Sequence, residues 1–92
     1  MQIQVEYFAQ ARDAAGCSCE VIELGDNQTL VDLARILASK HGGRMAQLVL
    51  SGDGSLSHQV IFTVNDLQVT GNTAVALADR DHVTIVPPIS GG

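Results

Sequence analysis

One strongly amphipathic segment, flanked on both sides by short alternating segments, limits the folds open to this chain. Its packing side chains recur at helical spacing, and they are Leu30, Leu33, Ala34, Leu37 and His41. A stripe of this kind packs one side of a helix on a sheet. Thr29 can cap the start of the helix and Asp32 suits its positive end, whereas Gly42-Gly43 can end it. The sequence therefore predicts one main helix between Thr29 and Gly43.

The segments around this helix alternate between apolar and polar residues, as half-buried strands do. In residues 2–8, Ile3, Val5 and Tyr7 point one way, and the polar residues between them point the other way. The other predicted strands are residues 18–24, 60–64, 67–69 and 82–86. Residues 9–15 suit a short helix that ends at Gly16, and residues 44–50 are ambiguous between helix and strand. This order of elements predicts an α+β sheet with its helix on one face.

The size and composition of the chain restrict the classes of protein to which it can belong. Its 92 residues suit one domain with one hydrophobic core. Apolar residues make up 46% of the chain and charged residues 16%, which excludes intrinsic disorder. The formal charge of −5 disfavours nucleic acid and anionic membranes as partners and favours a partner with a basic face. The N-terminal residues lack the features of a secretory signal, so we expect a cytoplasmic protein.

Cys17 and Cys19 lie two residues apart, so in a strand they would share one face. In the cytoplasm both are expected to stay reduced. A metal site would need further ligands at workable spacing, but His41, His58 and His82 are scattered along the chain. The sequence therefore predicts two free thiols and no metal site.

The chain ends in Pro87-Pro88-Ile89-Ser90-Gly91-Gly92, which we separate as a tail from a domain of residues 1–86. Proline has no N–H, so the pair ends the ladder of the last strand and stiffens the exit. One interpretation is a frayed terminus, and the other is a substrate tail whose glycines pass through a narrow channel. In the second case the carboxylate of Gly92 is a poor electrophile that must be activated. The activator would be ATP bound by another protein, because this chain has no phosphate-binding motif.

Four segments of the sequence resemble those of the ubiquitin-like sulfur carriers. They are Tyr7-Phe8-Ala9, Thr29-Leu30-x-x-Leu33, Val64-Asn65 and the ending Val86-Pro-Pro-Ile-Ser-Gly-Gly92. Within that family, the ending is most similar to that of the small subunits of molybdopterin synthase. Only the tail motif is specific, although the resemblance spans nearly the whole chain. It implies the β-grasp (ubiquitin-like) fold, a mixed sheet with one main helix packed on one face.

The resemblance also implies a reaction at the tail. An E1-like adenylating enzyme would activate the carboxylate of Gly92 with ATP, and a sulfur donor such as a cysteine desulfurase or a rhodanese would convert it to a thiocarboxylate. The molybdopterin synthase large subunit would then receive the tail and pass the sulfur to a pterin precursor. Gly91 and Gly92 carry the reaction in this scheme, whereas Pro87, Pro88, Ile89 and Ser90 contact the channels of the partners. The chain would bind no cofactor itself and would not be a free-standing enzyme.

Phe8 lies off the predicted core face of the first strand, so it can belong to a hydrophobic docking patch. A side chain that fills a small satellite core is an equally open interpretation. Two features depart from the family pattern. The family usually has Asp-Gly-Asp before its last strand, where this chain has Asp79-Arg80-Asp81, and Arg80 would cost roughly 1 kcal/mol there if the turn requires a positive φ. The loop of residues 51–58 is also longer than in the shortest carriers, which weakens a thiamine assignment.

Four functions remain open at this point. The first is a sulfur carrier for molybdenum cofactor synthesis, and the second is the same chemistry for thiamine, cysteine or a thiolated tRNA base. The third is a ubiquitin-like modifier joined through Gly92 to lysines of other proteins. The fourth is an interaction module with an idle tail. The acidic residues Asp79 and Asp81 are expected to be surface charge rather than an acid–base pair.

Overall fold

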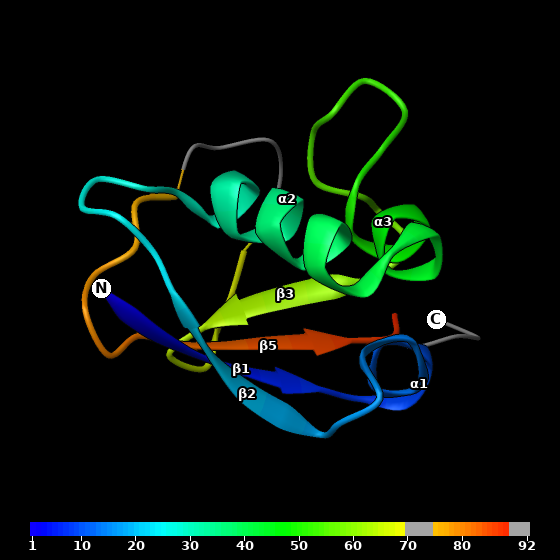
Figure 1. Cartoon of the computed structure of the whole chain (residues 1–92), viewed down its shortest axis with the longest axis horizontal. Coiled ribbons are helices and arrows are strands. Elements are labelled where there is room, and N and C mark those ends of the chain that lie inside the picture. Colours follow the sequence, from blue (N-terminus) through cyan, green and yellow to red (C-terminus); the bar gives the residue numbers. More distant parts are fainter. Residues whose placement is uncertain (70–74, 89–92) are drawn as a thin grey trace.

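The computed structural model describes residues 1–69 and 75–88, which form one sheet with helices on one side (Figure 1). In chain order the elements are β1 (Gln2–Tyr7), α1 (Ala9–Ala15), β2 (Cys19–Glu23), α2 (Leu30–His41), α3 (Gly43–Val49), β3 (Ile61–Val64), β4 (Leu67–Gln68) and β5 (His82–Val86). The predicted α+β class and the predicted main helix are confirmed.

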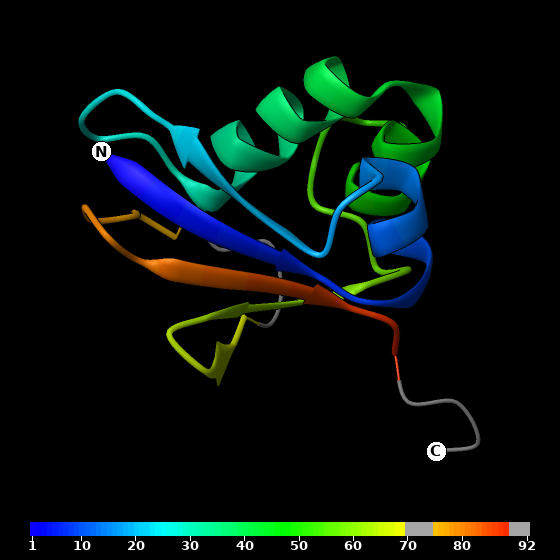
Figure 2. The ribbon, with the colours of Figure 1, turned by 60° about the horizontal axis from the view of Figure 1, so that its bottom comes forward.

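The sheet is mixed, and its last strand lies in the middle. The strand order is β2-β1-β5-β3-β4. β1 pairs antiparallel with β2 and parallel with β5, and β5 pairs antiparallel with β3. Figure 2 shows β5 between β1 and β3, with α2 and α3 beyond β2 and α1 at the end of β1. The described part of the chain therefore leaves the domain from the centre of the sheet.

The apolar side chains of β1 face the core, and the polar side chains between them face away from it, as the alternation in the sequence predicts. Ile3 and Val5 are fully buried and Tyr7 is nearly so. On β5, Val83 and Ile85 are fully buried in the same way. These side chains face the stripe of α2, whose buried members are Leu30, Leu33, Ala34 and Leu37. Burial of large apolar side chains on this scale contributes about 1.5–3 kcal/mol each, so the stripe and the strands stabilise one another.

The start of α2 is held by a capping box, which the sequence only half predicted. Thr29 Oγ1 accepts a hydrogen bond from the backbone N–H of Asp32, and the carboxylate of Asp32 accepts one from the N–H of Thr29 at 2.9 Å. Two of the free N–H groups at the helix start are satisfied in this way. The ambiguous segment of residues 44–50 is largely helical: α3 buries Met45 and Val49 at a spacing of four residues.

The cysteines depart from the expectation of a shared face. Cys17 precedes β2 and is half-buried against the core, whereas Cys19 lies within β2 and is exposed. The condition for a common face, that both cysteines belong to one strand, is not met, because the chain after α1 turns at Gly16 (φ 76°) and enters the sheet only at Cys19. Both thiols are free, as predicted.

Some predictions fall on residues that the structure does not describe. These are the predictions for the tail residues Ile89, Ser90, Gly91 and Gly92. The boundary between a domain of residues 1–86 and a tail stays a prediction, although β5 itself ends at Val86. Within residues 1–69 and 75–88, no helix is long and apolar enough to cross a bilayer.

Candidate functional site at the tail exit

The tail exit is the point at which the chain leaves β5. Val86 is the last residue of β5 and pairs with Ile61 of β3. Pro87 and Pro88 follow it, and both are exposed. Because neither proline has an N–H, the ladder cannot continue to either neighbouring strand. The sequence therefore releases the chain from the sheet at one defined place.

Phe8 lies beside this exit, although 77 residues separate it from Ile85. The parallel register places Tyr7 of β1 opposite Ile85 of β5, and the N–H of Phe8 donates to the carbonyl oxygen of Ile85 at 3.1 Å. Tyr7 is buried, so the next residue of an extended chain faces away from the core. The side chain of Phe8 accordingly remains 39% exposed.

Phe8, Ile61 and Val86 form a short apolar row at the exit, which we call the exit strip. Ile61 and Val86 are paired across the sheet and half-buried, and they alternate with buried neighbours that face the helices. Phe8 extends the row through the register of β1 with β5. The docking role predicted for Phe8 stays a prediction, but the fold places this residue beside the end of β5, from which the tail departs.

The sheet surface beyond the exit strip is polar. Glu6 of β1 lies opposite Thr84 of β5, and its carboxylate is 3.1 Å from Nε2 of His82. The hydroxyls of Thr63 and Thr84 are hydrogen bonded across β3 and β5. Val21 is apolar and exposed, but it lies on β2, the edge strand away from the exit strip. Apolar contact on this face is therefore concentrated where the tail departs.

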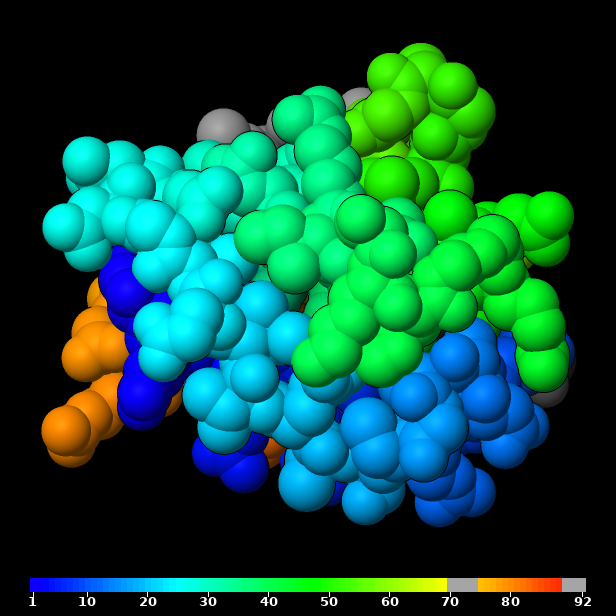
Figure 3. All heavy atoms as spheres, in the orientation of Figure 1, coloured from blue at the N-terminus to red at the C-terminus, as the bar shows by residue number. Residues whose placement is uncertain are grey.

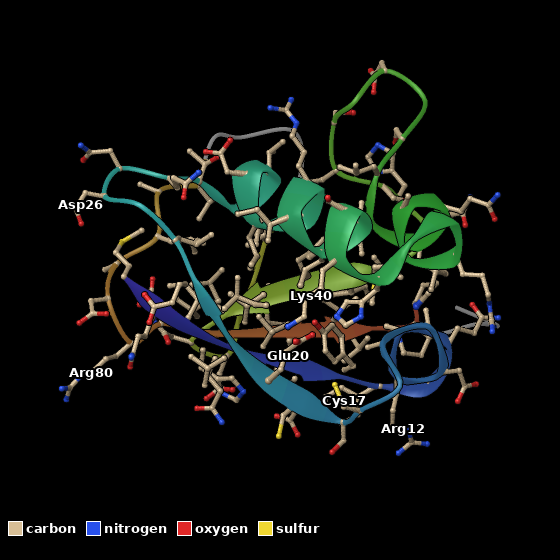
Figure 4. The ribbon with its side chains drawn as sticks, viewed as in Figure 1. Arg12, Cys17, Glu20, Asp26, Lys40 and Arg80 are labelled. Atoms are coloured by element: carbon tan, nitrogen blue, oxygen red, sulfur yellow. The ribbon has the colours of Figure 1, made fainter. Side chains whose placement is uncertain are left out.

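A polar cluster, which the sequence did not predict, fixes the end of β1 from the helix side. Glu20 of β2 accepts hydrogen bonds from the hydroxyl of Tyr7 and from Nζ of Lys40 at 2.5 Å, and its second contact with α2 is Nε2 of His41 at 2.5 Å. The ring of His41 also meets the ring of Tyr7 edge-on, with centroids 6.0 Å apart. Figure 4 shows Lys40 and Glu20 pointing toward one another between α2 and β2. Glu20 is 13 to 21 residues away from each of its three partners, a separation that no local pattern reveals.

The electrostatics of this cluster follow from its burial and its donors. Burial alone would raise the pKa of Glu20, but the hydrogen bonds from Lys40, Tyr7 and His41 outweigh it and hold the pKa below its ordinary value. Burial, and then the hydrogen bond to the Glu20 carboxylate, raise the pKa of the Tyr7 phenol. Glu20 is therefore an ionised acceptor that links β1, β2 and α2. Its contact on β1 is Tyr7, the residue before Phe8.

The opposite end of β5 is held by the turn at Asp79-Arg80-Asp81. Asp79 Oδ1 accepts from the N–H of Gln2 at 2.7 Å, and Asp81 Oδ2 accepts from the N–H of Ala78 at 2.8 Å. The two carboxylates, expected as plain surface charge, are thus acceptors that shape the turn. Arg80 adopts φ 70°. The turn therefore does place a positive φ at the position where the family usually has glycine. Among residues 1–69 and 75–88, no group of three His, Cys, Asp or Glu side chains is placed to hold a metal ion.

Comparison with known proteins places the chain among small ubiquitin-like carriers. The ThiS family model matches residues 5–92. A molybdopterin synthase sulfur carrier subunit from Chlamydomonas reinhardtii is 35% identical over 92 residues, covering all of both chains. The small archaeal modifier protein 3 of Haloferax volcanii is 26% identical, also over all of both chains. The crystal structure of SAMP1 from Haloferax volcanii superposes with a TM-score of 0.83 over all of both chains at 23% identity, and this likeness confirms the β-grasp fold.

Proposed function

The chain belongs to the ThiS family and is a ubiquitin-like sulfur carrier, and we propose that it supplies sulfur for molybdopterin synthesis. The observation that carries this proposal is the full-length, 35% identity with a molybdopterin synthase sulfur carrier subunit. The Pro87-Pro88-x-Ser90-Gly91-Gly92 ending agrees with it. A large synthase subunit would then be one partner and an E1-like adenylating enzyme another.

The reaction that we propose takes place at the carboxylate of Gly92. One carboxylate oxygen attacks the α-phosphorus of ATP on the adenylating enzyme, and pyrophosphate leaves. A persulfide on the donor protein then attacks the acyl carbon, and AMP leaves with that oxygen. A second thiol cleaves the S–S bond of the acyl disulfide so formed, which leaves a disulfide on the donor side and a thiocarboxylate on Gly92. The resulting thiocarboxylate gives its sulfur to the pterin precursor in the large subunit, and water restores the carboxylate. ATP is bound by the partner in this scheme, and the carrier contributes no cofactor of its own.

The exit geometry supports this division of work. A tail handled by a second protein must leave the carrier at a defined point and be free of the sheet. The central position of β5 and the exposed Pro87 and Pro88 meet the first requirement. The exit strip offers a partner an apolar contact around Phe8, directly beside the departing chain. Ile89 and Ser90 would continue that contact inside the channels of the partners.

A reconstituted transfer assay tests the proposed pathway. The thiocarboxylate form of the carrier is mixed with the molybdopterin synthase large subunit and its pterin precursor, and the dithiolene product is followed. We expect product in proportion to the thiocarboxylate consumed. An unchanged pterin, with a large subunit that works with another carrier, would contradict the pathway and direct the search to thiamine, cysteine or tRNA thiolation.

Protein modification is the second candidate function, because a relative of equal coverage is named a small archaeal modifier protein. In that case the activated acyl group of Gly92 would form an isopeptide bond with a lysine amine. Digestion of a cell lysate and a search for lysines bearing the carrier's terminal residues measure this directly. Adducts that depend on Gly92 would support it, and their absence while sulfur transfer proceeds would contradict it.

A further inference from the structure

A shallow hollow lies on the helix side of the tail exit. It has a volume of about 200 Å³ and is lined by Gln10, Arg44, Gln47, Leu48 and Gln59. α1 contributes Gln10 and packs against both α3 and β5, and α3 contributes Arg44, Gln47 and Leu48. In Figure 3 the blue atoms of α1 and the green atoms of α3 meet at the end of the molecule where these elements come together.

The hollow and the exit strip lie at the same end of the domain. Gln10 lies two residues after Phe8, and Gln59 lies two residues before Ile61. A partner that covers the exit strip and receives the tail therefore also comes within reach of the hollow. This reasoning depends on the proposed function, because it takes the tail to be handled by a second protein.

The charge at this end differs from the charge of the chain as a whole. Five acidic residues gather at the other end of β5, near its first residue or near the end of β2: Glu23, Asp26, Asp66, Asp79 and Asp81. Arg44 and Arg12 lie at the exit end together with one exposed carboxylate, Asp13 of α1, and neither arginine makes an ion pair within the described ranges 1–69 and 75–88. The chain carries −5 overall, yet the lining of the hollow contains a guanidinium and no carboxylate.

The chemistry of the lining selects one kind of occupant. A guanidinium fork binds a carboxylate with two parallel hydrogen bonds. Each glutamine amide offers both a donor and an acceptor, as the backbone of an extended peptide also does. We infer that the hollow receives an extended segment of the adenylating enzyme that carries an aspartate or glutamate, with its carboxylate on Arg44 and its backbone beside the three glutamines.

Binding of charge variants to the adenylating enzyme tests this inference. The affinity of the carrier for the purified enzyme is measured by calorimetry at low and at moderate salt. Arg44→Gln is expected to raise Kd about tenfold, and Arg44→Lys to raise it less because the charge remains but the fork is lost. Turnover at saturating carrier should be unchanged, since Arg44 lies outside the reacting tail.

Two matched arginines separate the hollow from general electrostatics. Arg12→Gln removes a charge at the same end but outside the hollow, and Arg35→Gln removes an exposed charge from α2. Each is expected to change Kd less than about twofold. An equal loss with Arg12→Gln, or an unchanged Kd with Arg44→Gln, would overturn the inference. Arg44 is exposed, and an unaltered thermal midpoint confirms that the variant is folded.

The proposed function fails separately from this inference. If the wild-type carrier is not adenylated by the enzyme, the proposed function is wrong and the hollow loses its partner. If the wild-type carrier is adenylated and Arg44→Gln binds equally well, only the hollow is wrong. Gln47→Ala and Gln59→Ala add a test of the amides, with an expected rise in Kd of about threefold each.

Discussion

The two ends of β5 differ in their hydrogen bonds. The first residue, His82, is hydrogen bonded by neighbouring segments, whereas the two residues after the last one, Val86, have no backbone N–H to donate. His82 donates to the side chain of Asn65 at 2.9 Å and accepts from the backbone of Asn65 at 2.7 Å, and the N–H of Gln4 reaches the carbonyl of Asp81. At the other end, Pro87 and Pro88 have no N–H and lie exposed. A small domain can therefore present a tail when hydrogen bonds hold the first residue of its last strand and prolines end the hydrogen-bonded ladder just after the last residue.

The tail end of β5, where the chain continues from Val86 to Gly92, is the site of the largest expected effect, the loss of sulfur transfer. Removal of Gly92 should abolish sulfur transfer, because the proposed reaction takes place at the carboxylate of this residue. The thermal midpoint should stay within about 1 °C, because Gly92 follows the last residue of β5 by six positions in the sequence and chain ends contribute little to stability. A melting curve and a transfer assay on the same preparation measure both quantities. A marked loss of thermal stability would show that the tail belongs to the body of the domain.

The first end of β5, which the turn at Asp79-Arg80-Asp81 anchors, is where we expect the largest change in stability. Asp81→Ala removes acceptors for the N–H of Ala78 and for the side chain of Asn65. The expected loss is about 1–3 kcal/mol in the free energy of unfolding, measured by urea titration. Asp26→Ala, in an exposed turn after β2, is the matched control and should change stability by less than about 0.5 kcal/mol. Equal effects of the two variants would mean that the turn does not anchor β5.

The exit strip predicts a change in binding without a change in folding. Phe8→Ser removes an exposed ring beside the end of β5, and it places a good capping residue at the start of α1. Affinity for the molybdopterin synthase large subunit should fall about tenfold. Val21→Ser removes another exposed apolar side chain, far from the exit, and should leave Kd unchanged. A similar loss with both variants would refute a specific role for the exit strip.

Arg80 tests how much strain the anchoring turn contains. Arg80→Gly should stabilise the fold by roughly 1 kcal/mol, because glycine adopts a positive φ without the steric cost of a side chain. Arg80→Ala keeps the backbone cost and removes only the long side chain, so it should be close to neutral. The two variants are compared by chemical denaturation under identical conditions. No gain with glycine would mean that the surrounding hydrogen bonds already compensate the strain.

The Glu20 cluster predicts the smallest effect, a change in the dependence of stability on pH. The folded-state pKa of Glu20 is lowered, so its contribution is present above the ordinary value of 4.5 and is lost as the pH falls through the lowered value. Glu20→Gln should therefore flatten the acid side of the stability profile between pH 7 and pH 3. Glu23→Gln, on the same strand but exposed, serves as the control. Parallel profiles for Glu20→Gln and the wild-type protein would contradict the assignment.

The elements with a local signal could be predicted from the sequence, and those that depend on pairing could not. The stripe of α2, the alternation of β1 and the positive φ asked of Arg80 are all properties of neighbouring residues. The position of Phe8 at the exit depends on the parallel pairing of β1 with β5, which joins the two ends of the chain. The Glu20 cluster joins three elements in the same way, so only the folded structure reveals it.

The cysteines show the same limit from the other direction. A spacing of two residues predicts a common face only if both residues belong to one strand. Cys17 lies in the bend before β2, so the spacing does not place its side chain on the same face as Cys19. Local patterns predicted single helices and strands, whereas the resemblance to sulfur carriers predicted the whole β-grasp fold. It did so because the tail motif and the order of elements agreed with one another.

Intact mass spectrometry of the carrier tests the central claim most directly. The protein is incubated with the adenylating enzyme, ATP and a sulfur source, and the product is fragmented to locate any change. The account predicts that one oxygen is exchanged for one sulfur, at Gly92. An unchanged mass, under conditions in which another carrier of the family is converted, would contradict the claim that this chain carries sulfur at its end.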